Sequence, residues 1–373
     1  MNTFGRQLRL TTFGESHGPA LGGVLDGLPS GLVIDHEAIE LALSRRRGGQ
    51  SRLTTPRREP DRVRFLSGLY EGRTTGTPLA FLVENEEVRS EDYARLADVY
   101  RPGHADFTYE AKYGLRDPRG GGRASARETV VRVIAGAIAM QWLGERGVRV
   151  YAYLSRVGRV SLVDEGWTAV ELTPTEEARL EARYSQLVPT LTEETAHEMA
   201  REVDRAREAK DSVGGIISCR VYGLPAGLGE PLYDKLSSRL SSAMLGINAS
   251  RGFELGEGFA LAQMRGSEAN DPFRLNEAGK VAQVTNRGGG TLGGITTGAP
   301  LTFRVAFKPT SSIGLPQETV RRDGEAVRLE ITGRHDPCLA LRAVPVVEAM
   351  AALTLMDFYL LHSLSAQRQR GED

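Results

Sequence analysis

Alternating hydrophobic and polar residues predict β-strands in both halves of the chain. These segments are residues 8–13, 79–83, 216–221 and 301–307. Two longer segments, at 129–143 and 345–361, are apolar on nearly every side of a helix. Such a helix is buried on all faces rather than laid on a surface. Strands combined with central buried helices predict an α+β fold, layered as a sandwich with the helices inside.

The remaining patterned segments are predicted to lie around this core. The segment at 193–210 is polar and charged, so we expect a helix with a solvated face. The stretch before it, at 167–190, is expected to be a peripheral insertion that contains a helix. A stripe with four-residue spacing predicts a helix packed on the core, and it consists of Leu232, Leu236, Leu240 and Met244.

One apolar segment, at 343–361, approaches the length of a membrane span. Glu348 and Asp357 lie inside it, and a charged side chain is costly at the middle of a bilayer. The segment therefore predicts a buried helix, and we expect no membrane partner. The tail beyond about residue 363 is expected to fray.

Three sequence motifs occur twice, in the same order. The pairs are residues 27–32 with 223–228, 74–83 with 296–305, and 117–124 with 336–343. Three ordered matches predict two similar halves that pack as one pseudo-symmetric unit. We therefore expect a single domain of residues 1–373. Its parts would be internal halves of about 5–145 and 212–362 and a peripheral insertion of about 150–211.

The composition of the chain indicates the class of protein and the cellular compartment that we expect. The chain has 373 residues and a net charge of −1, and it is 40% hydrophobic and 25% charged, as is typical of globular proteins. Its two cysteines are too few for a disulfide-framed secreted scaffold or a zinc ribbon. The scattered histidines show no metal-binding spacing, so we expect no metal. The N-terminus lacks the apolar stretch of a signal peptide, which predicts a cytoplasmic protein.

Arginine supplies most of the positive charge, since only five of the 47 basic residues are lysines. Genomic bias and thermal adaptation could explain this excess of arginine over lysine. Recognition of carboxylates and phosphates is the other explanation. Nine arginines gather at residues 45–73, which makes nucleic-acid binding an alternative. Residues 45–64 contain no aromatic side chain to stack on bases, and the whole chain is not basic. A pocket for a small polyanion is favoured, with no nucleic acid as partner.

Two glycine motifs resemble known sites but lack the required surroundings. Residues 14–18 fit the G-x-S-x-G motif of serine hydrolases, with Ser16 as the nucleophile. Pro19 and the glycines after it are poor material for the helix which that motif needs, so this alternative is disfavoured. Residues 288–293 fit G-x-G-x-x-G, but a strand rather than a helix is predicted to follow them.

Two further loops are better suited to binding anions. Residues 120–129 form a glycine-rich loop with two arginines ahead of a predicted helix, where Ser125 and Glu128 have the spacing of a capping box. Residues 308–312 combine a lysine with three hydroxyl groups, which suits a phosphate. His17 and His104 stand among glycines and charged residues, so we expect them to be exposed and able to titrate.

Taken together, these segments resemble the chorismate synthase family. The similar segments are residues 12–18, 101–106, 120–128, 308–312 and 333–337. The resemblance implies a β-α-β sandwich, a homotetramer, and a carbon–oxygen lyase of the shikimate pathway. Its reaction would be the 1,4-anti elimination of phosphate from 5-enolpyruvylshikimate 3-phosphate to give chorismate. That reaction requires reduced FMN but has no net redox change.

The resemblance also implies roles for individual residues. His17 would be the acid near the departing phosphate, and His104 would protonate or stabilise the anionic reduced flavin. Asp336, with Ser16, would tune protonation at the flavin ring. The implied FMN contacts are Arg123, Ala124, Ser125, Asn248, Ala249, Gly293, Lys308, Pro309, Thr310, Ser311, Ser312 and Arg334.

Two arginines complete the implied site. Arg46 and Arg52 match positions that hold the anionic groups of the substrate or of NADP. The resemblance leaves the reductant of the flavin open, since some members of the family use NADPH and others depend on an external reductant.

Overall fold

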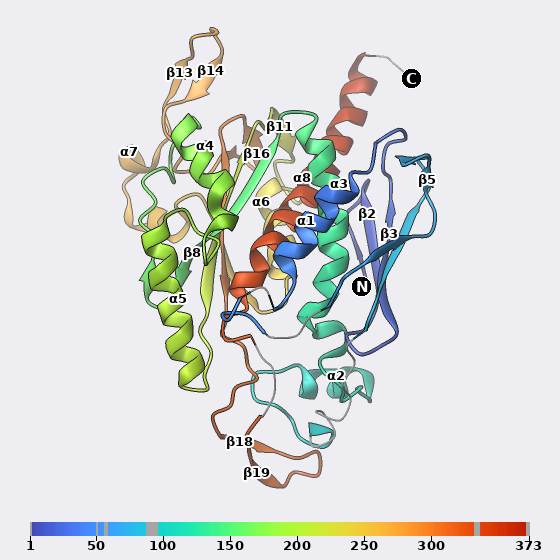
Figure 1. Cartoon of the computed structure of the whole chain (residues 1–373). Helices are drawn as coiled ribbons and strands as arrows, with labels where there is room; N and C mark the ends of the chain where they lie inside the picture. Colours follow the sequence, from blue (N-terminus) through green and yellow to red (C-terminus); the bar gives the residue numbers. More distant parts are fainter. Residues whose placement is uncertain (1, 50, 56–58, 87–95, 332–335, 371–373) are drawn as a thin grey trace.

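Two five-stranded antiparallel sheets lie on either side of a layer of helices (Figure 1). The computed structural model describes residues 2–49, 51–55, 59–86, 96–331 and 336–370. The first sheet has the order β1 (Thr3–Phe4), β2 (Arg9–Gly14), β3 (Ala20–Asp26), β7 (Leu79–Glu84) and β4 (Val63–Phe65). The second sheet has the order β12 (Ser250–Leu255), β17 (Leu301–Phe307), β10 (Gly215–Tyr222), β8 (Arg149–Val157) and β9 (Val160–Ser161). The mixed strand and helix content predicted from the sequence is confirmed.

Two long apolar helices form the middle of the molecule. Helix α3 (Thr129–Gly144) packs against β3 and β7 of the first sheet, and α8 (Ala340–Arg370) packs against β8 and β10 of the second. The two helices also pack on each other. Helices α1 (His36–Arg46) and α6 (Leu236–Leu245) cover their remaining sides. This position explains why α3 and α8 carry apolar residues on nearly every face.

Glycines allow unusually close packing between these layers. A Cβ atom on Gly136 of α3 would lie only 2.4 Å from the Cα atom of Ala349 in α8. A Cβ atom on Gly23 of β3 would lie 2.7 Å from a methyl group of Val131. Both glycines therefore permit contacts that any larger residue would block.

The repeated sequence motifs adopt repeated structures. Strand β3 pairs with β7, and β10 pairs with β17 in the same antiparallel manner. Thr74 Oγ1 donates to the carbonyl oxygen of Pro29 at 2.6 Å, and Thr296 Oγ1 donates to that of Pro225 at 2.7 Å. Each threonine also accepts a bond from the N–H of the leucine three residues after that proline, at 3.0 and 2.8 Å. A threonine at the equivalent position therefore stabilises the corresponding turn in each half.

The smaller elements surround the two sheets. The short strands form three hairpins and one three-stranded sheet: β5 (Leu69–Tyr70) with β6 (Arg73–Thr74), β13 (Phe273–Leu275) with β14 (Val281–Gln283), β18 (Gln317–Val320) with β19 (Ala326–Leu329), and β11 (Ala226–Gly229) with β16 (Ile295–Thr297) and β15 (Thr291–Leu292). The remaining α-helices are α2 (Asp106–Tyr113), α4 (Pro174–Glu181), α5 (Glu193–Glu208) and α7 (Gly266–Ala269). Short 3₁₀ turns occur at Gly122–Ala124, Ala126–Glu128, Ala182–Ser185 and Gly258–Gln263.

Helix α5 has the predicted solvated face, and its opposite, apolar face, which includes Met199 and Val203, is buried beside β8 and β9. The structure differs from the sequence predictions in two other places. Leu232 is 67% exposed, since α6 begins only at Leu236 and leaves it outside the buried stripe. Strand β8 falls almost wholly within the range expected for the peripheral insertion, about 150–211, yet it pairs with β10 and β9 in the second sheet.

Among the described residues, one helical segment, Ala340–Ser363, is long and apolar enough to cross a membrane. Within its most apolar window, 83% of the residues are buried inside the structure. The segment is the core helix α8, as its two internal carboxylates predicted.

The close contact between α3 and α8 can be tested with one methyl group. We expect Gly136→Ala to lower the free energy of unfolding by about 1–3 kcal/mol, because its Cβ atom would overlap the backbone of Ala349. Gly144→Ala is the matched control, since Gly144 ends the same helix, is exposed and has open space around it. Urea unfolding at one protein concentration measures both. Equal stability of the two variants would contradict this packing.

Candidate active site

A cavity of about 590 Å³ lies where loops from distant parts of the chain meet. Of the residues proposed from the sequence, it is lined by His17, Arg46, His104, Ala124, Ser125, Asn248, Ala249, Lys308, Pro309, Thr310, Ser311, Ser312 and Asp336. The loop before α3 and the loop after β17 both face it. The fold therefore gathers most of the predicted site residues into one space.

Positive charge predominates in the lining of this cavity. Its cationic side chains are Arg46, Arg101, Arg127, Arg251, Lys308 and Arg342. Three carboxylates, Glu59, Asp61 and Asp336, also face it, so six cations stand against three anions. A cavity with such an excess attracts a ligand that carries several negative groups.

His17 is held against the glycine-rich loop. It follows β2, is 6% exposed, and its Nδ1 lies 3.0 Å from the Oγ of Ser16. Gly120 has a φ of +68°, and a Cβ atom there would lie 2.4 Å from the His17 ring. Arg101 Nη2 donates to the carbonyl oxygen of Gly120 at 2.7 Å and so fixes the loop. His17 is more buried than the sequence predicted, because this loop closes over it.

The lining of the cavity also contains buried polar atoms that have no hydrogen-bond partner among the described residues. The side-chain amide of Asn248 donates to the carbonyl oxygen of Ala124 at 2.8 Å, while its Oδ1 is buried without a hydrogen bond among the described residues. Thr310 Oγ1 is also buried without a hydrogen bond to any described residue. Lys308 Nζ donates to the carbonyl oxygen of Gly103 at 2.7 Å. Burial, followed by the nearby charge of Arg251, lowers the pKa of Lys308.

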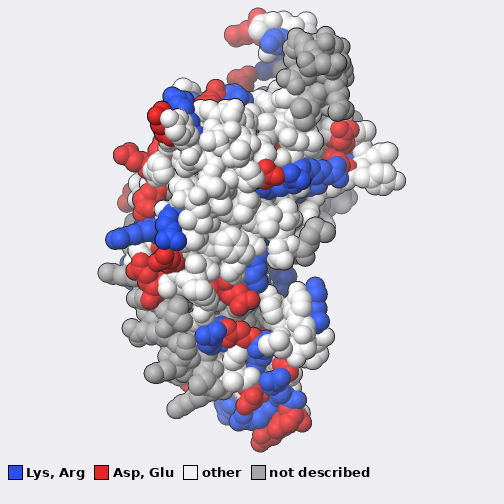
Figure 2. All heavy atoms as spheres, turned by 90° about the vertical axis from the view of Figure 1, so that its right-hand side faces the viewer, with Lys and Arg blue, Asp and Glu red and all other residues white. Residues whose placement is uncertain are grey.

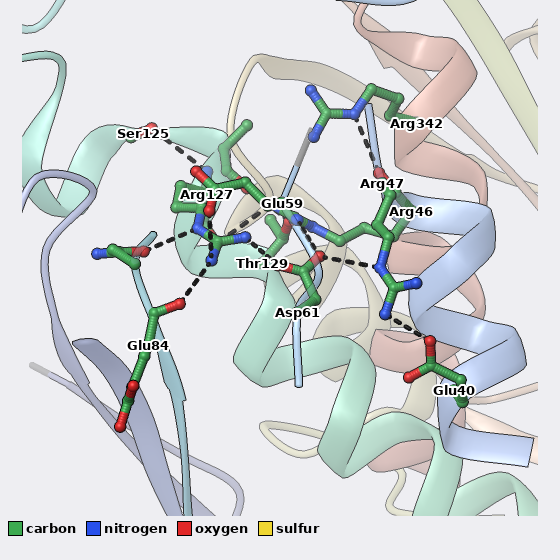
Figure 3. A network of polar contacts seen from close by, with 12 residues as sticks. Glu40, Arg46, Arg47, Glu59, Asp61, Glu84, Ser125, Arg127, Thr129 and Arg342 are labelled. Atoms are coloured by element: carbon green, nitrogen blue, oxygen red, sulfur yellow. Dashed lines mark hydrogen bonds and ion pairs between the residues drawn. The ribbon is translucent and has the colours of Figure 1, made fainter. Parts of the chain in front are cut away.

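A buried carboxylate organises the arginines at one wall of the cavity (Figure 3). Asp61 is fully buried, and it accepts a hydrogen bond from Arg46 Nη1 at 3.2 Å and another from Arg127 Nη1. Arg46 Nε donates to Thr129 Oγ1 at 3.1 Å. Its Nη2 donates to the carbonyl oxygens of residues 126 and 127 at 3.0 and 3.2 Å. Arg46 therefore joins α1 to the start of α3.

The ionisation of this cluster follows from its burial. Burial opposes the charge of Asp61, but Arg46 and Arg127 together outweigh that effect and lower its pKa. The pKa of Arg46 is lowered to about 9, chiefly by burial, even though Asp61 favours its charged form. Repulsion from Arg342 and Arg127 contributes to the same lowering. Asp61 thus makes it possible to hold several guanidinium groups close together.

Both buried helices start near the cavity. Asp336, shortly before α8, accepts a hydrogen bond from the N–H of Thr55 at 2.9 Å and another from Arg342 Nη1 at 2.7 Å. Arg342 Nε donates to the carbonyl oxygen of Arg46 at 3.0 Å. The Asp-Pro pair of the repeated motif precedes both α3 and α8, whereas the Arg-Ala pair lies before α3 but within the first turn of α8. Residues next to both helix starts line the cavity, so the helix dipoles add to its attraction for anions.

Comparisons with known proteins agree with this geometry. The family model for chorismate synthase matches residues 8–360. The chain is 53% identical over 360 residues to the chorismate synthase of Porphyromonas gingivalis, and this match covers 96% of each chain. It is 49% identical over 360 residues to that of Synechocystis sp., covering 96% of this chain and 97% of the relative.

A solved structure agrees as well. The crystal structure of a chorismate synthase matches with a TM-score of 0.75 and 29% sequence identity, covering 96% of this chain and 93% of that one. The chain belongs to the chorismate synthase family. It is an enzyme, a lyase of the shikimate pathway.

Four residues predicted for the chorismate synthase site lie outside the cavity lining. Arg52 is more than half exposed and forms an ion pair with Asp204 at 3.0 Å. Gly293 lies in the turn between β15 and β16. Arg123 lines a neighbouring cavity and donates to Thr12 Oγ1 at 2.6 Å. Ser16 is 1% exposed beside His17, which leaves it unsuited to be the nucleophile of a serine hydrolase. A fifth residue, Arg334, lies outside the described residues.

The predicted capping box is wrong in detail. Ser125 Oγ accepts from the N–H of Arg127 at 3.3 Å, while Glu128 pairs with Arg132 at 2.6 Å. The cause is a 3₁₀ turn at Ala126–Glu128, which delays the start of α3 to Thr129. Ser125 therefore caps the 3₁₀ turn and not the helix.

Sequence reasoning also missed several cavity residues. Arg101 and Arg127 lie within motifs that had been singled out, and Arg342 belongs to the repeated motif, so each carried a signal. Asp61 and Arg251 stand outside every motif. Only the packing of distant segments brings these two into the site.

The contribution of the Asp61 cluster to stability can be tested by removing its negative charge. We expect Asp61→Asn to lower the free energy of unfolding by about 3–5 kcal/mol, because two buried guanidinium groups lose their counterion. Asp26→Asn, which breaks the exposed pair with Arg9, should cost less than about 1 kcal/mol.

The pH dependence of this difference follows from the lowered pKa of Asp61. The stabilisation is complete above the unfolded-state pKa of about 3.9 and is lost as the pH falls through the lower, folded-state value. Denaturant unfolding at pH 7 and at several acidic pH values checks this prediction. If the two variants lost equal free energy of unfolding at pH 7, the proposed role of Asp61 as the counterion of the buried arginines would be contradicted.

Proposed function

We propose that this enzyme converts 5-enolpyruvylshikimate 3-phosphate to chorismate by 1,4-anti elimination of phosphate, with reduced FMN and no net redox change. The observation that carries the proposal is the convergence of six cations and two histidines on one cavity in a member of the chorismate synthase family. The substrate carries two carboxylates and a phosphate, which match this excess of positive charge.

The residues of the cavity fit FMN. Within the described part of the chain, Asn248 Oδ1 and Thr310 Oγ1 are buried polar atoms without hydrogen-bond partners, and a bound polar ligand would satisfy them. Lys308 and the hydroxyl groups of Ser311 and Ser312 suit the phosphate of the cofactor. Reduced FMN, when bound, supplies an electron-rich ring that can take up a proton. Ala124, Ser125, Ala249 and Pro309 line the same space.

The two histidines have separate roles in this proposal. His17 donates a proton toward the departing phosphate, which neutralises charge that develops as the C–O bond breaks. His104 stabilises the anionic form of the reduced cofactor by hydrogen bonding. Asp336 and Ser16 adjust protonation at a distance, through Arg342 and His17 respectively.

The arginines divide by position. Arg127 and Arg342 line the cavity, and we place the substrate anions near them. Arg127 and Arg46 contribute mainly their charge, because the nitrogen atoms of both already bind protein oxygens. The roles of Arg52 and Arg123, Gly293 and Arg334 at the ligands stay predictions, and so does NADPH as the reductant.

We further propose a β-α-β sandwich with pseudo-symmetric halves and a cytoplasmic homotetramer. The sheet orders β2-β3-β7-β4 and β8-β10-β17-β12 support the duplication. The outer side of the first sheet supports association, because Figure 2 shows much of this face without charged side chains. Phe13 of β2 is 46% exposed. Uncharged surfaces of this kind commonly mark protein interfaces.

The reaction is tested by an anaerobic assay with 5-enolpyruvylshikimate 3-phosphate and dithionite-reduced FMN. We expect phosphate release and chorismate absorbance to rise together with reduced FMN and to stay flat with oxidised FMN. Addition of NADPH with oxidised FMN then tests whether the protein reduces its own flavin. A folded protein that binds FMN but releases no phosphate would refute the proposed reaction.

The site assignment is tested by two variants that serve as controls for each other. We expect Lys308→Ala to weaken FMN binding, because it removes a cation from the proposed phosphate position. His17→Ala should lower kcat by roughly 10²–10⁴-fold while FMN affinity stays close to wild type. Fluorescence titration of FMN and steady-state kinetics measure both. Unchanged FMN affinity in Lys308→Ala, or lost affinity in His17→Ala, would overturn the corresponding role.

A further inference from the structure

The side chain of His104 lies in the wall between two cavities. It lines the cavity described above and also the neighbouring one, of about 780 Å³, as Gly120 and Gly121 do. The imidazole is 20% exposed, and its Nδ1 lies 2.9 Å from Oδ1 of Asp106. Its other nitrogen, Nε2, lies beside Gly121, 3.4 Å from where a Cβ atom on that glycine would be. The two ring nitrogens thus have different surroundings.

Asp106 is fixed from two sides by arginines. Arg101 donates from Nε to Oδ2 and from Nη2 to Oδ1, both at 2.7 Å. The backbone N–H of Arg101 donates to Oδ2 at 3.1 Å. Arg116 Nη1 lies 2.7 Å from Oδ1. Asp106 is 5% exposed, and the two guanidinium groups are as deeply buried, so this carboxylate has little freedom to turn.

The surroundings keep Asp106 ionised. Burial opposes its charge, but the hydrogen bonds from Arg101 and His104 outweigh burial and hold the pKa of the carboxyl far below its usual range. An ionised carboxylate has no proton to donate. The nitrogen of His104 that faces it must therefore be the one that carries a hydrogen.

The net charge near His104 indicates how Asp106 acts. Arg101 and Arg116 more than balance its single negative charge. On α2 and beside it, Glu110 pairs with Arg322 and lies 3.6 Å from Arg116. On the loop after β17, Lys308 binds the carbonyl oxygen of Gly103. The role of Asp106 at His104 therefore follows from their hydrogen bond, which fixes the direction of the ring.

We propose that Asp106 is a positioning residue that holds His104 as the Nδ1–H tautomer, with Nε2 as the nitrogen that exchanges protons in the site. In the neutral ring, Nε2 is then an acceptor. When the ring is protonated, Nε2 carries the proton that can be donated to an anion. The catalytic part of this inference rests on the proposed function, whereas the tautomer does not.

The tautomer is measured by ¹⁵N NMR of the histidine-labelled full chain without ligands, with His104 assigned by comparison with His104→Gln. We expect Nδ1 of His104 to resonate as a protonated nitrogen and Nε2 as an unprotonated one. Asp106→Asn should abolish that preference, because an amide places a donor where the carboxylate only accepts. An Nε2–H tautomer in the wild type, or an unchanged spectrum in Asp106→Asn, would overturn the proposal.

Kinetics supply the second readout. We expect Asp106→Asn to lower kcat by roughly 10–100-fold, the usual effect of removing an orienting partner, with KM near the wild-type value. Glu110→Gln is the matched control, because Glu110 lies beside Arg116, which also contacts Asp106, and pairs with Arg322 without contacting His104. It should change neither the tautomer nor kcat.

The two outcomes separate this inference from the proposed function. If the wild type shows no turnover but His104 has the Asp106-dependent tautomer, the function fails and the positioning stands. If the wild type turns over and Asp106→Asn keeps its kcat, the positioning role in catalysis is wrong. Should Asp106→Asn fail to fold, the wild-type spectrum alone still decides the tautomer.

Discussion

The structure depends on buried carboxylates that hold arginines in place around the active-site cavity and its neighbour. Guanidinium groups repel one another, and removing them from water is costly unless each has a counterion and hydrogen-bond partners. Asp61 meets this need for Arg46 and Arg127, and Asp106 meets it for Arg101 and Arg116. The protein can therefore present a fixed, concentrated positive charge to a polyanion without relying on mobile surface side chains.

The layered core determines where this charge is placed. Helices α3 and α8 run between the two sheets, and a copy of the same Asp-Pro and Arg-Ala motif lies at the start of each (Figure 1). Their close approach at Gly136 brings the starts of both helices to one cavity. Packing in the core and binding at the site are thus linked, because a shift between the helices would move two walls of the cavity.

Many elements of the fold and residues of the site could be predicted from the sequence. These are the ones whose local hydrophobic pattern matches their burial in the folded protein. Strand β17 and helix α3 were found from periodicity because their surroundings are uniformly buried or alternate regularly. Strand β8 was missed, since the segment of residues 167–190 and helix α5 pack beside it and blur its alternation. Motif residues such as His104 and Lys308 were found, whereas Asp61 was not, because its partners come from distant segments.

The most direct test of the central claim is a crystal structure of the protein with both FMN and 5-enolpyruvylshikimate 3-phosphate bound. The account predicts that both ligands occupy the 590 Å³ cavity, with the substrate anions against Arg127 and Arg342 and the flavin beside His104 and Asn248. Ligands bound elsewhere, with this cavity holding only water, would contradict it.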